Sequence, residues 1–370
     1  MPDSKRILVA PLNWGLGHAT RCIPVIRALL QEGHQPYIAS DGVALNLLQK
    51  EFPDLPSFHL PSYKIKYAKK GKHFKIKMIW DSPKVLKAMA KEKKAVKKLV
   101  KEHDIDGIIS DNRLGVYYKK VPCIFITHQL NVLSGNTTWF SSKVHQKIIK
   151  KFDECWVPDV AGKPNLTGKL GHLKKSKKKI KYLGPLSRFV REDVEKVYDL
   201  MVLLSGPEPQ RTFLEEKLLK ELQEFEGNIL FVKGKIEKEQ TTETQPLKNG
   251  SLKLVNFMQS QTLEKAINES ALVLSRSGYT TVMDLAKLQK KSFFIPTPGQ
   301  YEQEYLAKRL QKKGLVPYAN QEDFTISELK RVKKYQGLQH FNVQIDYASL
   351  FSAFSNVKEN SEPTPSSLST

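Results

Sequence analysis

The stretch Leu272–Leu310 constrains the fold more than any other part of the chain. Its apolar run Leu272–Leu274 has the length of a buried strand, small residues interrupt it, and helical spacing resumes over Tyr279–Leu288. A strand, a small-residue turn and a helix in this order aim free backbone N–H groups at one place, where the helix N-terminus favours an anion such as phosphate. The pattern therefore predicts an α/β fold with a phosphate site at Ser275, Arg276, Ser277 and Gly278.

The rest of this stretch extends the predicted site to a nucleotide sugar. Asp284 lies further along the first helix, where its carboxylate would accept hydrogen bonds from a ribose. A second strand, Ser292–Ile295, leads through a rigid polar loop to another helix start, where Gln303 and Glu304 would bind sugar hydroxyls. The alternative is an ordinary βα turn without a ligand, since such turns recur in many proteins.

The segments SRSGYTTVMDLA and IPTPGQYEQEYLAKRL together resemble the C-terminal donor domain of glycosyltransferase family 28, which includes the peptidoglycan enzyme that adds N-acetylglucosamine to a lipid-linked acceptor. The resemblance implies the GT-B fold, in which two Rossmann-like α/β domains face each other across a cleft. It also implies a nucleotide-diphosphate sugar donor, a uridine one, and inversion at the anomeric carbon. In that family Phe257 and Met258 would lie at the uracil, although Phe257 also suits a core position. Arg188 and Arg211 are candidate diphosphate ligands or ordinary surface arginines.

A second glycine-rich turn follows the first predicted strand, Arg6–Leu12. The third glycine of a dinucleotide-binding fingerprint is missing from it. The turn instead resembles the first loop of the same glycosyltransferase fold, which faces the acceptor. Pro24 is comfortable only near a helix start, so the next helix is predicted to begin around Thr20–Ile23. The acceptor-side residues of this loop are Asn13, Gly15, Gly17 and His18.

His18 is the candidate general base, because an ordinary histidine is largely neutral near pH 7 and able to take a proton. The alternative is a histidine that caps the helix or packs under the loop. Asp111 ends the predicted strand Gly107–Ser110, and ligands of open α/β sheets lie at such ends. Asp111 is therefore the candidate partner of His18, with an Asx turn or helix cap as its alternative. His128, after the strand Cys123–Ile126, is predicted to contact the acceptor or to satisfy its own loop.

The net charge of +22 implies anionic partners. Between Tyr63 and His103 there are fifteen lysines against three acidic residues, and this segment contains Trp80 and an amphipathic helix over Pro83–Glu102. Such a segment suits an anionic membrane surface. A solvated lysine face on an ordinary helix is the alternative. Nucleic acid is not expected as a partner, because no recognition module or stacking-aromatic pattern accompanies the charge.

The remaining features concern the location of the chain and its domains. No segment approaches a membrane span and no signal peptide is evident, so with three scattered cysteines we expect a cytoplasmic protein, peripheral on the membrane face. The predicted units are an acceptor-binding domain over 1–183, a donor-binding domain over 184–335, helices over 336–356 that return to the first domain, and a disordered tail over 357–370.

These observations predict a glycosyltransferase that moves a sugar from a nucleotide diphosphate to an acceptor hydroxyl. A lipid-linked acceptor at the membrane surface is one candidate. No cofactor is expected. No metal is expected either, because the one Asp-x-Asp triplet, Asp104–Asp106, precedes a strand and so lies at the edge away from the cleft. Two alternatives stay open: a nucleotide-sugar epimerase on the same fold, and a catalytically silent membrane-associated subunit that binds the nucleotide sugar.

Overall fold

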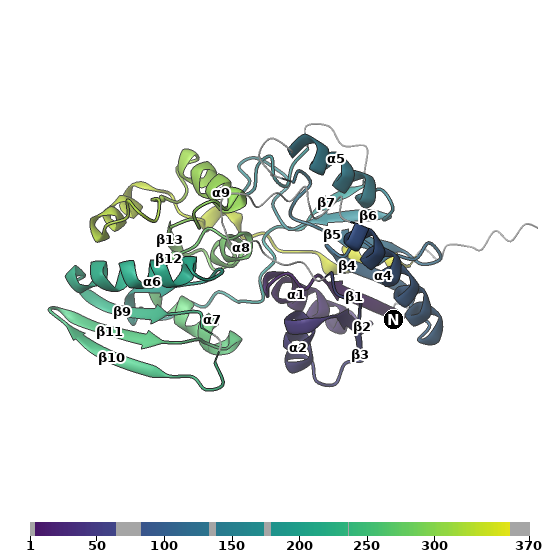
Figure 1. The fold of residues 1–370 in the computed structure, drawn as a ribbon, viewed down its shortest axis with the longest axis horizontal. Coiled ribbons are helices and arrows are strands. Elements are labelled where there is room, and N and C mark those ends of the chain that lie inside the picture. Colours follow the sequence, from purple (N-terminus) through teal and green to yellow (C-terminus); the bar gives the residue numbers. More distant parts are fainter. Residues whose placement is uncertain (1–3, 64–82, 133–137, 174–178, 236, 356–370) are drawn as a thin grey trace, which may run out of the picture.

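The computed structural model describes residues 4–63, 83–132, 138–173, 179–235 and 237–355. They form two parallel α/β units side by side, each built around its own sheet (Figure 1). The predicted segment around Trp80 and the predicted disordered tail 357–370 lie outside the described residues. Among those described, no helix combines the length and apolar character needed to cross a bilayer.

The first unit contains a seven-stranded sheet in the order β3-β2-β1-β4-β5-β6-β7, and every strand pairs in parallel with its neighbours. The strand order reverses between β1 and β4, so the residues that follow these two strands meet at the point where open sheets bind ligands. The elements of this unit are β1 (Arg6–Pro11), α1 (Gly17–Gln31), β2 (Gln35–Ser40), α2 (Gly42–Glu51), β3 (Ser57–His59), α4 (Pro83–Glu102), β4 (Gly107–Asp111), β5 (Cys123–Ile126), α5 (Thr138–Ile149), β6 (Glu154–Val157) and β7 (Ile180–Tyr182).

The second unit contains a six-stranded sheet in the order β10-β11-β9-β8-β12-β13, parallel except for the β10–β11 hairpin. Its order reverses between β8 and β12, which places the Ser275–Gly278 turn at the equivalent point of this sheet. The elements are β8 (Tyr198–Leu203), α6 (Gln210–Glu221), η3 (Leu222–Glu224), β9 (Gly227–Val232), β10 (Thr242–Leu247), β11 (Gly250–Val255), α7 (Ser260–Asn268), β12 (Ser270–Ser275), α8 (Tyr279–Lys287), β13 (Lys291–Phe294), α9 (Tyr301–Lys312) and η4 (Ile326–Lys334).

The last described segment returns to the first unit, where its yellow ribbon lies beside the first sheet (Figure 1). It contains η5 (Gln339–Phe341), α10 (Tyr347–Phe351) and η6 (Ser352–Phe354). Phe351 and Phe354 are buried in the core on the α1 face of the first sheet. A Cβ at Gly107 would lie 2.3 Å from the Phe354 ring, so β4 needs glycine there to let this segment dock. Burying one such phenylalanine contributes about 1.5–3 kcal/mol.

Two details of the predicted secondary structure were wrong. Helix α1 begins at Gly17, a turn earlier than predicted, and Pro24 lies inside it. Because Pro24 has no backbone N–H, α1 lacks one internal hydrogen bond. The residues of the additional first turn belong to the site described below. The edge strand β10, which pairs antiparallel with β11, was not among the predicted strands.

Candidate active site

His18 and Asp111 meet at the carboxyl edge of the first sheet. Asp111 is the last residue of β4, and His18 lies in the first turn of α1, which follows the loop after β1. The His18 Nδ1 atom lies 3.0 Å from the Asp111 Oδ1 atom, and both side chains are buried. The geometry is that of an imidazole whose orientation and tautomer a carboxylate can fix.

Arg21, which the sequence analysis missed, binds the same carboxylate. Its Nε atom donates to Asp111 Oδ2 at 2.5 Å and its Nη2 atom donates to Asp111 Oδ1. Such a bidentate pair is typical of arginine and carboxylate. The Nη2 atom also lies 2.6 Å from His18 Nδ1. The sequence does place His18 and Arg21 three residues apart, a spacing that puts two side chains on the same face of a helix. Because the helix was predicted to begin after His18, this spacing was not recognised.

The cluster continues through His128 and Gln129 of the first unit to side chains of the second. His128, after β5, accepts from Arg21 Nη1 at 2.9 Å, and its Nε2 atom lies 3.3 Å from Glu302 Oε2 at the start of α9. The Gln129 amide donates to the same Glu302 oxygen. The ring of Tyr279, the first residue of α8, lies 4.3 Å from that of His128. The cluster therefore connects the ends of β4 and β5 with the N-termini of α8 and α9.

The charges of the cluster set the pKa values of its members. Burial and the neighbouring Arg21 cation lower the pKa of His18 to about 4, against an opposing contribution from Asp111. Burial alone would raise the pKa of Asp111, but Arg21 and His18 hold it well below its usual range. At neutral pH the site thus contains a neutral imidazole and an ionised carboxylate, the states that proton abstraction needs.

The predicted acceptor-side loop is held by contacts on both sides. The Asn13 amide donates to Asp41 Oδ2 at 3.1 Å, which ties the loop to the residue before α2. Gly15 has a φ of 77°, in the left-handed region that favours glycine. A Cβ at Gly17 would lie 2.6 Å from Thr280 Oγ1 of α8, so a glycine here lets the two units approach closely.

In the predicted phosphate turn, the side chains point into the protein. The Arg276 guanidinium donates to the carbonyl oxygens of Ile295 at 3.2 Å, Pro296 at 3.1 Å and Gln210 at 2.8 Å. Ser277 Oγ donates to the carbonyl oxygen of Gln303 at 2.8 Å. In the described structure no side chain caps α8 at Gly278, so the backbone N–H groups of the helix N-terminus, rather than the Arg276 side chain, are the donors left for an anion at this turn.

Asp284 is placed differently, beside the segment that connects the two units. Its Oδ1 atom accepts from Ser187 Oγ at 2.5 Å, and burial raises its pKa to about 6, although Ser187 and Arg188 oppose the rise. Burial lowers the pKa of Arg188, and its Nε atom has no partner among the described residues. Asp284 and Arg188 thus keep hydrogen-bonding capacity that neighbouring residues do not use.

The other residues predicted to bind the donor already form hydrogen bonds within the protein. Arg211 donates to Glu215 at 2.6 Å and to Glu208 at 2.7 Å, so it is neither a free diphosphate ligand nor a surface arginine. The Gln303 side chain accepts from the backbone N–H of Thr297, and that of Glu304 accepts from Gly299, each at 2.8 Å. Both side chains hold the loop before α9. The predicted uracil-side residues, Phe257 and Met258, are partly buried after β11.

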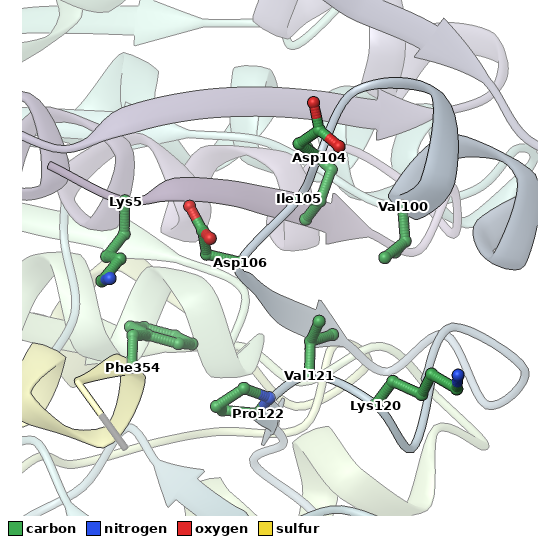
Figure 2. A pocket seen from close by; sticks show the side chains of 9 residues that line it. All are labelled: Lys5, Val100, Asp104, Ile105, Asp106, Lys120, Val121, Pro122 and Phe354. Carbon is green, nitrogen blue, oxygen red and sulfur yellow. The ribbon is translucent and has the colours of Figure 1, made fainter. Parts of the chain in front are cut away.

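The Asp104–Asp106 triplet, on which the prediction of a metal-free site rests, lies at the opposite edge of the first sheet. Asp104 and Asp106 precede β4 there and line a cavity of 270 Å³ together with Lys5 and Phe354 (Figure 2). Asp106 accepts from the backbone N–H of Arg6 at 2.8 Å, and Asp104 pairs with the Arg6 side chain at 3.1 Å. Within the described ranges, no three His, Cys, Asp or Glu residues gather in a way that would hold a metal ion. Transfer without a metal stays a prediction.

Comparison with known families matches both units of the chain. Residues 210–340 match the glycosyltransferase family 28 C-terminal domain, and residues 5–151 match glycosyl transferase family 1. An uncharacterized glycosyltransferase of Methanosarcina acetivorans is 23% identical over 92% of this chain and 95% of its own length. The UDP-N-acetylglucosamine--N-acetylmuramyl-(pentapeptide) pyrophosphoryl-undecaprenol N-acetylglucosamine transferase of Clostridium tetani is 25% identical over 80% of each chain.

A likeness in structure accompanies the likeness in sequence. The glycosyltransferase SnogD from Streptomyces nogalater superposes with a TM-score of 0.63 at 12% identity, over 96% of each chain. Identity this low bears on the fold alone, and it confirms the predicted architecture of two parallel α/β sheets.

Proposed function

We propose that this glycosyltransferase, a GT-B protein with a family 28 C-terminal domain, transfers a sugar from a uridine diphosphate donor to an acceptor hydroxyl with inversion. The observation that carries the proposal is the His18–Asp111 pair, buried at the edge of the first sheet beside His128, whose ring packs against Tyr279 at the start of α8 in the second unit. The first unit, 1–183, would bind the acceptor, and the second, 184–335, would bind the donor.

His18 takes the acceptor proton in this proposal. When its Nδ1–H donates to Asp111, the lone pair on Nε2 is available to the acceptor hydroxyl, whose oxygen then attacks the anomeric carbon as the bond to the donor diphosphate breaks. Asp111 stabilises the imidazolium that forms. The charge that develops on the leaving diphosphate is met by the backbone N–H groups at Gly278 and the start of α8, preorganised dipoles of the kind that stabilise developing anions.

The nucleotide is proposed to lie along α8. The Asp284 carboxylate would accept hydrogen bonds from the ribose hydroxyls, and Arg188, with an unpartnered Nε atom beside it, would lie near the diphosphate. The name of the Clostridium tetani relative supports uridine and a lipid-linked acceptor. No cofactor enters this proposal, and the acceptor and sugar are proposed only by class.

Attachment to an anionic membrane surface is the second part of the proposal. Helix α4 buries Val96 and Val100 against the sheet and exposes a face with seven lysines, namely Lys87, Lys91, Lys93, Lys94, Lys97, Lys98 and Lys101. Each basic residue close to anionic lipid contributes about 1 kcal/mol. Binding to vesicles with phosphatidylserine should therefore be strong at low salt and fall steeply as salt increases. Equal binding to neutral vesicles, or tight binding to single-stranded nucleic acid without vesicle binding, would contradict this part.

The proposed activity is tested by incubating the purified protein with a panel of nucleotide-diphosphate sugars, with and without lipid extracts. We expect release of the nucleoside diphosphate that requires both a uridine donor and an acceptor. Conversion of the donor sugar without an acceptor would indicate an epimerase. Donor binding without turnover under any combination would indicate a silent binding subunit, and either result would overturn the proposal.

A further inference from the structure

Arg113 is the centre of a second buried charge network at the carboxyl edge of the first sheet. It follows β4, and its side chain is 0% exposed. Its Nε atom donates to Glu92 of α4, its Nη1 atom to Asp41 and its Nη2 atom to the carbonyl oxygen of Pro61, each at 2.7 Å. A buried guanidinium that is paired on three sides cannot turn without leaving charge unpaired, so its position is fixed.

Glu92 anchors this network to α4. Its buried carboxylate accepts from Arg113 through one oxygen and from the backbone N–H of Gly115, at 3.0 Å, through the other. The Tyr63 hydroxyl donates to that second oxygen and accepts from the backbone N–H of Leu114 at 3.1 Å. Both oxygens of Glu92 are therefore used inside the protein, and the role of this carboxylate is to hold Arg113.

Asp41 connects Arg113 to the acceptor-side loop, residues 13–17. One of its oxygens accepts from Arg113, and the other accepts from the Asn13 amide at 3.1 Å. Asp41 is the N-cap residue of α2, a position where aspartate usually accepts from the helix backbone, yet its side chain makes no such bond. The Asn13 oxygen instead accepts from the backbone N–H of Ala44, the third residue of that helix, at 3.4 Å.

Asn13 is thus held at both ends of its amide, which donates to Asp41 and accepts from Ala44. A Cβ at Gly42 would lie 2.3 Å from Asn13 Nδ2, so the side chain lies directly against the start of α2. The loop residues that follow Asn13 are exposed or partly exposed, and they lead into His18. The loop is therefore fixed at its start by Asn13 and at its end by α1.

We propose that Asp41 is a positioning residue for the acceptor: held by Arg113, it fixes Asn13 and with it the loop that precedes His18. The inference rests on the proposed function, because that function places the acceptor hydroxyl at His18. Asp41 acts through Asn13 and not on the donor, whose proposed site is in the second unit. Its loss should therefore raise the amount of acceptor that half-saturates turnover and leave donor affinity unchanged.

The first measurement follows the loop itself and needs no turnover. The full-length chain is labelled with 5-fluorotryptophan, and a Trp14→Phe variant assigns the ¹⁹F NMR signal of Trp14, the neighbour of Asn13, among those of the four tryptophans. Asp41→Asn sets one amide N–H group against another, and Asn13 cannot turn its amide to compensate because its oxygen faces Ala44. Asn13→Asp brings two carboxylates together.

Each single variant should shift the Trp14 signal. The double variant, Asp41→Asn with Asn13→Asp, restores a donor and an acceptor with their direction reversed, because the new amide donates to the new carboxylate while its oxygen still accepts from Arg113. Its Trp14 signal should return to the position seen in the unmodified protein. A recovery of this kind separates a specific contact from a general loss of structure.

Turnover is the second measurement, with the lipid extract that supports release of uridine diphosphate as the source of acceptor. Asp41→Asn should raise the half-saturating amount of that extract by ~10–100-fold, the usual cost of losing an orienting partner. The double variant should recover most of this loss. Calorimetry should give the same affinity for uridine diphosphate in all variants, since the loop is not part of the proposed donor site.

Glu154→Ala is the matched control, because Glu154 lies in the same unit and its side chain is 10% exposed, against 13% for Asp41. It pairs with Lys181 at 3.0 Å and accepts from the Trp156 indole at 2.9 Å, at the opposite edge of the sheet. Its loss should shift the signal of Trp156 but leave the signal of Trp14 and the acceptor requirement unchanged.

An unmoved Trp14 signal in the folded single variants would overturn the inference, and so would a moved signal with an unchanged acceptor requirement. A double variant no better than the single ones would also overturn it. A signal that moves in the single variants and returns in the double one, in a protein that transfers no sugar with any donor and extract, would leave the positioning of the loop standing and refute the proposed function.

Discussion

The carboxyl edges of the two sheets use their buried arginines in different ways. At the first edge, Arg21 is directed at an ionised carboxylate and a histidine, so the charged side chains converge on one another. At the second edge, Arg276 is directed at backbone carbonyl oxygens, and no carboxylate pairs with it in the described structure. There the N-terminus of α8 has free backbone N–H groups instead. Under the proposed function, the first edge carries out the proton transfer and the second binds the diphosphate of the donor.

This difference predicts different effects for substitutions at the two edges. A side chain removed from the first edge should lower turnover and leave donor affinity intact. In the second unit, the loss of Asp284 from α8 should act on donor affinity. Three experiments address this contrast, in order of expected effect.

His18→Ala should lower the turnover rate by ~10²–10⁴-fold, the usual contribution of a positioned general base. Its affinity for uridine diphosphate should hardly change, because the proposed nucleotide site is at the other edge. His172→Ala is the matched control, since His172 also contacts a buried aspartate, Asp159, at 3.0 Å but outside the cluster. Steady-state kinetics and calorimetry of both variants measure the effects. Full turnover in His18→Ala would remove the base from the first edge.

Asp284→Ala should weaken the binding of uridine diphosphate by about 1.5–3 kcal/mol, the contribution of hydrogen bonds to a charged group. Asp199→Ala is a suitable control, because Asp199 lies in the same unit at the start of β8, at the opposite edge of the sheet. Calorimetry on both variants provides the comparison. Equal affinities of a folded Asp284→Ala variant and the unmodified protein would place the nucleotide elsewhere.

Asp284→Asn should raise the free energy of unfolding at pH 8 by ~1–2 kcal/mol. The pKa of Asp284 is raised from 3.8 to about 6 in the folded protein, so the folded state binds the proton more tightly than the unfolded chain does. Through this group stability falls as pH rises from about 4 to about 6, and asparagine removes that fall. Urea denaturation of both proteins at pH 4 and pH 8 tests the sign. A gain of equal size at both pH values would show that the carboxylate is not strained by burial.

Local patterns were enough to predict most of the fold. Helix α4 has the predicted bounds, and the predicted strands Cys123–Ile126 and Leu272–Leu274 lie within β5 and β12. The edge strand β10 was missed because most of its side chains are exposed, so its residues show no alternation of apolar and polar character. Its pairing depends on the hairpin turn Lys248-Asn249, which lacks the usual glycine within the turn, so no strong turn signal marked it.

At the candidate site, the position of a residue after a strand was a better guide than its chemical type. His18 follows β1 and Asp111 ends β4, and strand order brings them together. Arg211, Arg276 and Gln303 had suitable chemical types, yet each is occupied by nearby backbone or carboxylate groups. The sequence holds no signal for that occupancy, because it depends on how tightly each loop folds against its neighbours.

The sequence by itself determined the strand–turn–helix units and the residues that end each strand, because apolar periodicity and turn residues act over short distances along the chain. Only the tertiary structure decided which charges share a proton network. Arg21 and Asp111 are 90 positions apart, and His128 and Glu302 are 174 apart. Hydrogen bonds between such residues require side chains to approach within about 3 Å, and that approach is set by the packing of the two units against each other.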